Sequence, residues 1–265
     1  MDVISYLLGK KSGGGAENTN NAKIDTSLGY TSNGFRTIVT SIDDLSLSGI
    51  TTLQYFFQAC SKLTDFPELN TTNVNNMSNM FVGCSSMVTA PLYDTSNVTQ
   101  MYSMFENCTN LVNVPAYDTS KAISMAGMFN SCSSLVEVPN FSTANVTGMN
   151  SMFYGCSNLV TAPTMDTSNV TDMGNMFYND SKLENLPYYN ASKCTNFSSM
   201  FTNVSKLTDT SLDNVLKMCI SATTYAGTKT LFAMGFRGSK IASSKWQACA
   251  SYDDFLTAGW TIGYN

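Results

Sequence analysis

The chain has 265 residues, a net charge of −5 and no histidine, and only 12% of its residues are charged. Without histidine, Ser-His-Asp triads, Cys-His dyads and histidine metal sites are excluded. From Thr64 to Ser181 the only lysine or arginine is Lys121, which argues against nucleic-acid binding, because that requires cations to displace counterions from phosphates. The sequence therefore predicts a protein without enzymatic activity, cofactor, metal or nucleic-acid partner.

Residues 1–22 differ in composition from everything that follows, with the sequence MDVISYLLGKKSGGGAENTNNA. The apolar run is only six residues long, from Val3 to Leu8, and its lysines follow it, whereas a secretory signal carries its positive charge first. We therefore expect no signal peptide, and no apolar run in the chain is long enough for membrane insertion. The glycines Gly13–Gly15 predict a linker.

The opening YLLGKKSGGG resembles the start of structural proteins encoded in phage and prophage genomes. The resemblance implies a docking segment that contacts other virion proteins, and the alternative is a passive terminus. The docking residues that we expect are Val3, Ile4, Tyr6, Leu7 and Leu8.

Residues 23–49 are predicted to cap the array that follows, because they contain the strand-like run Thr37–Ile42. The open end of a stack of strands exposes apolar side chains and unpaired backbone groups, so it requires a cover.

Residues 50–209 repeat with a period of 24. The phenylalanines of this repeat are Phe57, Phe81, Phe105, Phe129, Phe153, Phe177 and Phe201. The six prolines of the chain follow the same spacing at Pro67, Pro91, Pro115, Pro139, Pro163 and Pro187. A fixed period between 20 and 50 residues is typical of a solenoid, and the spacing gives seven repeats.

Within one repeat, Asn73–Met77 is predicted to form a short strand and Asn79–Val82 one helical turn. Gly83 follows the turn, at a position that holds glycine, asparagine or serine in the five repeats after it, as a left-handed helix end requires. Val88–Ala90 is expected to be a second strand with Val88 inward and Thr89 outward. Asp94 begins a turn in which its side chain accepts backbone hydrogen bonds.

The pattern NVTxMxxMFxxCxxLVxxP with DTSNVT corners resembles the BspA-like leucine-rich-repeat proteins of bacterial surfaces, which include a subgroup first noted in mycoplasmas. The resemblance covers Ile50–Asp209, or 160 of the 265 residues. It implies a right-handed leucine-rich-repeat-like β-solenoid with short parallel strands, which acts by binding and often as an adhesin. With the one-turn helices and a mixed α/β C-terminal cap, this is the predicted fold class.

Residues 210–265 leave the period and are predicted to be a C-terminal helical cap. Helical spacing of apolar residues is present in Ser211–Ile220, with Ser211 as N-cap. Two more short helices are expected in Ser239–Ala250 and Tyr252–Ala258, the second ended by Gly259. The tail GWTIGYN resembles the ends of repeat proteins from phage tail regions.

Two columns of reactive side chains are interpreted as structural. Each of the first five repeats has one cysteine at the same position, which predicts small buried thiols; whether Cys219 and Cys249 pair is left open. Asp94, Asp118 and Asp166 share one corner, where other repeats have serine or asparagine. This substitution favours turn caps over a calcium site.

Two further columns are candidates for binding. The aromatic column two residues after each proline contains Tyr93, Tyr117 and Tyr189, but also Phe141 and Met165, which favours the edge of the core over an exposed stripe. The variable column beside the second strand is the predicted partner-binding surface. Its residues are Thr89, Asn113, Glu137, Thr161 and Asn185.

The resulting hypothesis is a non-enzymatic structural protein of a phage particle, located in the virion. Its partners would be a host-surface protein or glycan at the solenoid and other virion proteins at the N-terminal segment. A bacterial cell-surface adhesin is the alternative, and a glycan-active enzyme is a second one, although no pair of acids facing a cleft is marked in the sequence. Whether copies of the chain associate with one another is left open.

Overall fold

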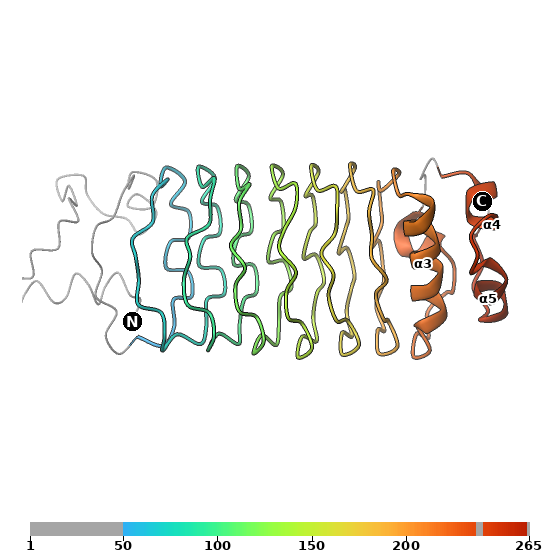
Figure 1. Ribbon diagram of the computed structural model, residues 1–265, viewed down its shortest axis with the longest axis horizontal. Helices are drawn as coiled ribbons and strands as arrows, with labels where there is room; N and C mark the ends of the chain where they lie inside the picture. The colour runs from blue at the N-terminus through green and yellow to red at the C-terminus, as the bar shows by residue number, and fades with distance from the viewer. Residues whose placement is uncertain (1–49, 237–240, 264–265) are drawn as a thin grey trace, which may run out of the picture.

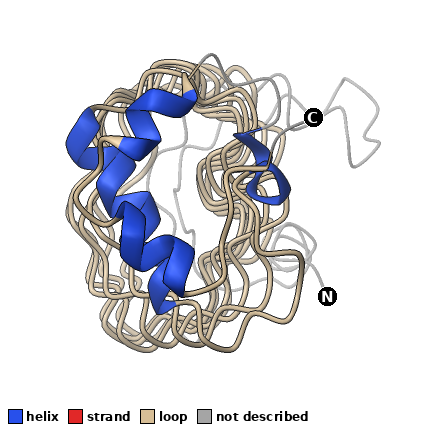
Figure 2. Ribbon diagram, turned by 90° about the vertical axis from the view of Figure 1, so that its right-hand side faces the viewer, coloured by secondary structure: helices blue, strands red, loops and turns tan. Residues whose placement is uncertain are grey.

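The computed structural model describes residues 50–236 and 241–263. The expected docking residues and the N-terminal cap therefore lie outside the described residues. Successive 24-residue coils lie side by side along the long axis, and the helices stand at the C-terminal end (Figure 1). Viewed end-on, the coils superpose into one oblong outline (Figure 2). We call residues 50–208 the coil stack.

Neighbouring coils pair in parallel with a constant register of 24. Isolated parallel bridges join Thr52 to Asn76 and Asn76 to Gln100, and the row continues to Asn196. A second row is represented by the bridges of Thr89 with Asn113 and of Thr161 with Asn185. Among the described residues these contacts remain single bridges and do not extend into the short strands that the sequence predicts.

The helical turn expected at Asn79–Val82 is wrong, because the backbone there alternates between two kinds of hydrogen bond. Phe81 N donates to Met104 O of the next coil at 2.9 Å, whereas Val82 N donates to Asn79 O, three residues back, at 3.3 Å. An α-helix would direct every amide to the residue four back. Positive φ angles of 59° at Asn79 and 75° at Gly83 turn alternate amides toward the neighbouring coil.

The core is a set of like residues stacked on like residues. The seven phenylalanines of the repeat form one continuous file, with neighbouring ring centroids 5.3–5.9 Å apart and ring planes within 14° of parallel. The methionine columns headed by Met77 and Met80 are completely buried. Because each side chain is covered by its equivalents in the adjacent coils, a single coil has no complete core of its own.

The column cysteines are buried, and none of them forms a disulfide. Cys84 Sγ donates to Phe57 O at 3.1 Å, and Cys108, Cys132 and Cys156 make the same contact with the equivalent phenylalanine carbonyls. Burial raises the pKa of these thiols well above the usual range. They therefore satisfy buried carbonyl groups and remain protonated.

Helix α3, Asp209–Ser221, covers the C-terminal end of the coil stack with Leu212, Val215 and Leu216 buried beneath it. Its N-cap is Thr208 rather than the predicted Ser211. The hydroxyl of Ser211 is used elsewhere, since it donates to Glu184 O at 2.8 Å.

The segment after α3 completes the end of the stack. In the π-helical segment η2, Phe232–Phe236, Met234 O accepts the hydrogen bond of Phe201 N at 2.9 Å. The ring of Phe236 stacks on Phe201 at 5.0 Å and so extends the phenylalanine file beyond the repeats.

Two short helices follow, α4 at Ser243–Gln247 and α5 at Tyr252–Thr257. Helix α4 begins later than predicted, because Ala242 has extended backbone. Cys219 and Cys249 are unpaired. None of the helices in the described part of the chain is long and apolar enough to cross a membrane.

Candidate partner-binding ridge

The predicted partner-binding column is exposed along its whole length. Hydrogen bonds between coils order its polar side chains: Asn113 Nδ2 donates to Thr89 Oγ1 at 3.2 Å, and Asn185 Nδ2 donates to Thr161 Oγ1 at 3.3 Å. Backbone bridges join the same pairs. The column therefore presents polar groups whose positions are fixed by the stack.

A second exposed column lies beside it, although the sequence pattern had predicted that its side chains face the core. Val88, Val112 and Val136 are 51%, 40% and 46% exposed, although Val88 was expected to point inward. The reason is local: Val112 N and Asn113 N both donate to Val88 O, at 2.9 and 3.1 Å. One carbonyl thus serves two successive amides, the alternation of a regular strand is lost, and two adjacent side chains face solvent.

We call the two columns together the ridge. Its apolar column is Val88, Val112, Val136 and the half-buried Val160, and its polar column is Thr89, Asn113, Glu137, Thr161 and Asn185. The ridge carries one acidic side chain and no basic one. Valine followed by a variable residue in four successive repeats was the only signal available in the sequence, and the exposure of the valine side chains could not be inferred from it.

The ridge ends in a hollow of about 480 Å³ where α3 replaces the next coil. Thr161 and Asn185 of the ridge line this hollow, and so do Pro187 and, at the start of α3, Thr208 and Thr210. The hollow was not predicted from the sequence, because it depends on where a helix outside the period packs.

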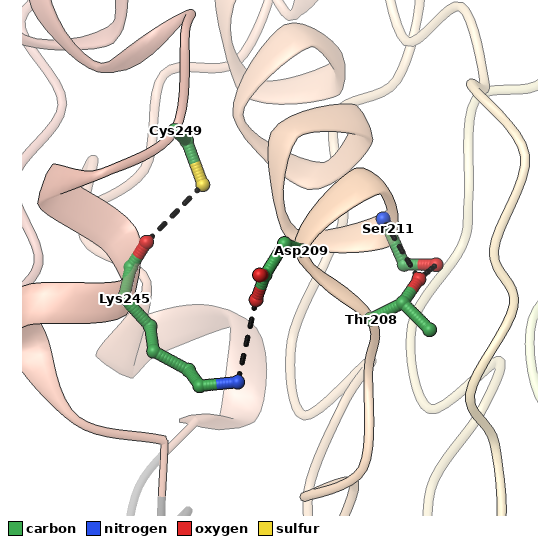
Figure 3. Close-up of polar contacts among 5 residues, drawn as sticks. All are labelled: Thr208, Asp209, Ser211, Lys245 and Cys249. Atoms are coloured by element: carbon green, nitrogen blue, oxygen red, sulfur yellow. Dashed lines mark hydrogen bonds and ion pairs between the residues drawn. The ribbon is translucent and has the colours of Figure 1, made fainter.

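Two sets of contacts fix the start of α3 beside this hollow. Thr208 Oγ1 accepts from Ser211 N at 3.3 Å, and Ser211 Oγ also accepts from Leu186 N at 2.9 Å. Figure 3 shows the carboxylate of Asp209 facing Lys245 of α4, and the two form an ion pair of 3.3 Å. The helix start is therefore anchored both to the last coil and to α4.

The aromatic column is buried and forms the edge of the core. The hydroxyl groups of Tyr93 and Tyr117 donate to the carbonyl oxygens of Pro67 and Pro91, at 2.9 and 2.6 Å. Burial raises the pKa of both phenols. This column is therefore unavailable as an exposed stripe for a ligand.

The aspartates at the repeat corner act as turn caps. Asp94 Oδ1 accepts from Ser96 N at 2.9 Å, and Asp118 and Asp166 make the same contact with the serine two residues on. Hydrogen bonds from the side chain and the amide of that serine lower the pKa of each carboxyl. No group of three or more potential metal ligands is present among residues 50–236 and 241–263.

The family model described as "Mycoplasma protein of unknown function, DUF285" matches residues 26–138, 89–162 and 124–231. These matches overlap and together span 206 of the 265 residues, as expected where one repeated unit can be aligned in several registers. No curated protein matches the chain. The chain belongs to the DUF285 family, a family of repeat proteins with BspA-like repeats.

Proposed function

We propose that this protein is a non-enzymatic binding protein whose coil stack, a right-handed leucine-rich-repeat-like β-solenoid, presents the ridge to a macromolecular partner. The observation that carries the proposal is the exposure of the equivalent valines of three successive coils, at 40–51%, beside a polar column ordered by hydrogen bonds between coils. Apolar area next to a few fixed polar groups is the composition of protein recognition surfaces. Because the surface is ordered before binding, little side-chain entropy is lost when a partner docks.

The setting that we propose is a bacteriophage particle, in which the ridge contacts a host-surface protein or glycan, or a neighbouring virion protein. Support comes from the opening YLLGKKSGGG and the tail GWTIGYN, which resemble phage structural proteins. In this proposal Val3–Leu8 docks the protein to the particle.

A bacterial cell-surface adhesin is the second candidate, and one observation favours it. The matching family is described from Mycoplasma, a cellular organism. Both candidates use the same ridge, and they differ in the assembly that holds the N-terminal segment.

Site-specific crosslinking tests the ridge. A photo-crosslinking residue is placed at Thr89, and in a matched control at Thr147, an exposed threonine of a different column. We expect a discrete partner crosslinked at Thr89, and a reduced yield when Val112→Asp introduces a charge beside it. Equal yields from the two positions, or crosslinks at Thr147 alone, would refute the ridge as the binding surface.

Purification of the native assembly tests the setting. Mass spectrometry of purified particles and of cell envelopes from the producing organism should find the protein at a fixed copy number per particle. A protein confined to the envelope fraction would replace the virion setting with the adhesin.

A further inference from the structure

We propose that the hollow at the C-terminal end of the ridge is a binding site for a neutral saccharide. This inference rests on the proposed binding function and names a ligand class for one end of the same surface.

The hollow is lined by polar groups that have unused hydrogen-bonding capacity. Among the described residues, the hydroxyls of Thr164 and Thr210 have no hydrogen-bond partner, and both threonines are exposed. Asn185 Nδ2 donates to Thr161 Oγ1 at 3.3 Å, and Asn185 Oδ1 accepts no hydrogen bond from any of the described residues. Hydroxyl and amide groups offer donors and acceptors together, which matches the hydroxyl groups of a sugar.

The apolar side of the hollow suits the ring of a sugar. Leu186 and Pro187 contribute to its wall. A volume of about 480 Å³ lies within the range of about 300–1,000 Å³ that is usual for small-molecule sites.

The charge around the hollow favours a neutral ligand. None of the lining side chains is ionisable. The nearest acid along α3, Asp209, faces Lys245 at 3.3 Å (Figure 3). An anionic ligand would find no lysine or arginine in the wall to bind its charge.

The repeats supply a control pair with the same chemistry, which is flanked by a coil instead of a helix. Asn113 and Thr89 make the hydrogen bond of Asn185 and Thr161 at the same repeat positions, three coils earlier. Another coil follows Asn113, whereas α3 follows Asn185 and opens the hollow. If a saccharide binds only at the hollow, its affinity should therefore depend on Asn185 and not on Asn113.

The test uses the full chain with maltose, N-acetylglucosamine and galacturonate as probes, observed by saturation-transfer NMR and titration calorimetry. We expect a neutral sugar to bind at concentrations up to about 10 mM, and galacturonate to bind more weakly or not at all. Asn185→Ala and Thr210→Val should each reduce affinity about fivefold, the effect of one lost hydrogen bond. Asn113→Ala, which changes the ridge three coils away from the hollow, should leave the affinity for the sugar unchanged whatever its effect on the macromolecular partner of the ridge. Thermal unfolding of each variant establishes that it is folded.

Other results overturn the inference. Absence of binding by both neutral sugars, tighter binding of galacturonate, or equal losses in Asn113→Ala and Asn185→Ala would each do so. Failure of the inference and failure of the proposed function can be separated. If the Thr89 crosslink persists in a protein that binds no sugar, only the saccharide site is wrong. If a sugar binds but Thr89 crosslinks to nothing, the ridge proposal is wrong.

Discussion

Replacing Asp180 with cysteine should stabilise the coil stack. Asp180 is completely buried at the repeat position where earlier coils have cysteine. Neither of its carboxyl oxygens has a hydrogen-bond partner among the described residues, whereas Cys156 Sγ donates to Phe129 O at 3.1 Å. Burial raises the pKa of Asp180 well above its usual range, because a medium of low polarity disfavours the carboxylate.

The size of the effect follows from the missing partners. A buried polar group without a hydrogen bond costs about 1–3 kcal/mol, and a thiol at this position can donate to Phe153 O as the other column cysteines donate to their equivalents. We therefore expect Asp180→Cys to raise the free energy of unfolding by about 1–3 kcal/mol while Asp180 is protonated.

The gain should increase with pH. The folded-state pKa of Asp180 lies above the unfolded value, so the stability of the wild type is highest below the unfolded pKa, where the carboxyl is protonated in both states. The stability falls as the pH rises through the folded pKa. At neutral pH the wild type therefore loses stability that Asp180→Cys retains.

Urea unfolding of the full chain at about pH 4 and about pH 7 measures both effects. Asp180→Asn is the companion variant: it remains polar and buried but cannot ionise, so it should lose the pH-dependent part while keeping most of the cost of an unpaired group. A lower urea midpoint for Asp180→Cys than for the wild type, or a difference that shrinks toward neutral pH, would refute the reasoning.

Three further predictions concern the corner aspartates, the left-handed turns and the thiols. Asp166→Ser should reduce the loss of stability between about pH 5 and about pH 2. Hydrogen bonds from Ser168 lower the pKa of Asp166 and stabilise the fold only while the carboxyl is ionised. Urea midpoints of the variant and the wild type across this range measure the difference. Gly127→Ala should destabilise by about 1–2 kcal/mol, since Gly127 has φ +64° and a Cβ would lie 2.8 Å from Ser103 Oγ; Gly148→Ala is the control, because its nearest atom lies at 3.8 Å, and equal melting temperatures for the two variants would contradict the argument. Iodoacetamide should modify Cys249 before any other cysteine of the native protein, since it alone of the described cysteines is not buried; peptide mass spectrometry measures this order.

The period of 24 residues was sufficient to predict which side chains stack on which. A constant register places Phe81 next to Phe105, and their rings are 5.3 Å apart and 1° from parallel. The same logic predicts the buried cysteines and the capping role of Asp94. In each case the residues at equivalent positions of the coils share one environment, so comparing the repeats of this single chain is as informative as comparing several aligned sequences.

The backbone between the columns was harder to predict. The first left-handed position of each coil holds Tyr55, Asn79, Ser103, Gly127, Ser151, Asn175 and Ser199, and this mixture gives no consistent glycine signal. The second position has more glycine and asparagine and was recognised. Left-handed backbone at a residue such as Tyr55 is unfavourable in isolation, and here hydrogen bonds to the next coil compensate for it. Such compensation depends on the stack and leaves no local pattern.

The exposed columns differ in how their polar groups are used, and some of them serve mainly to hold neighbouring coils together. Thr171 Oγ1 donates to Thr147 O at 3.1 Å, and Asn145 Nδ2 donates to Ser120 O at 2.8 Å. These side chains satisfy backbone carbonyls of the preceding coil, so they contribute to stacking and have less capacity left for a ligand. On the ridge, by contrast, Thr89 and Asn113 bond to each other's side chains and lie beside exposed valines whose burial would be favourable. A surface that served only to hold coils together would not require exposed valine in three successive repeats, whereas a surface that docks a partner would gain from it.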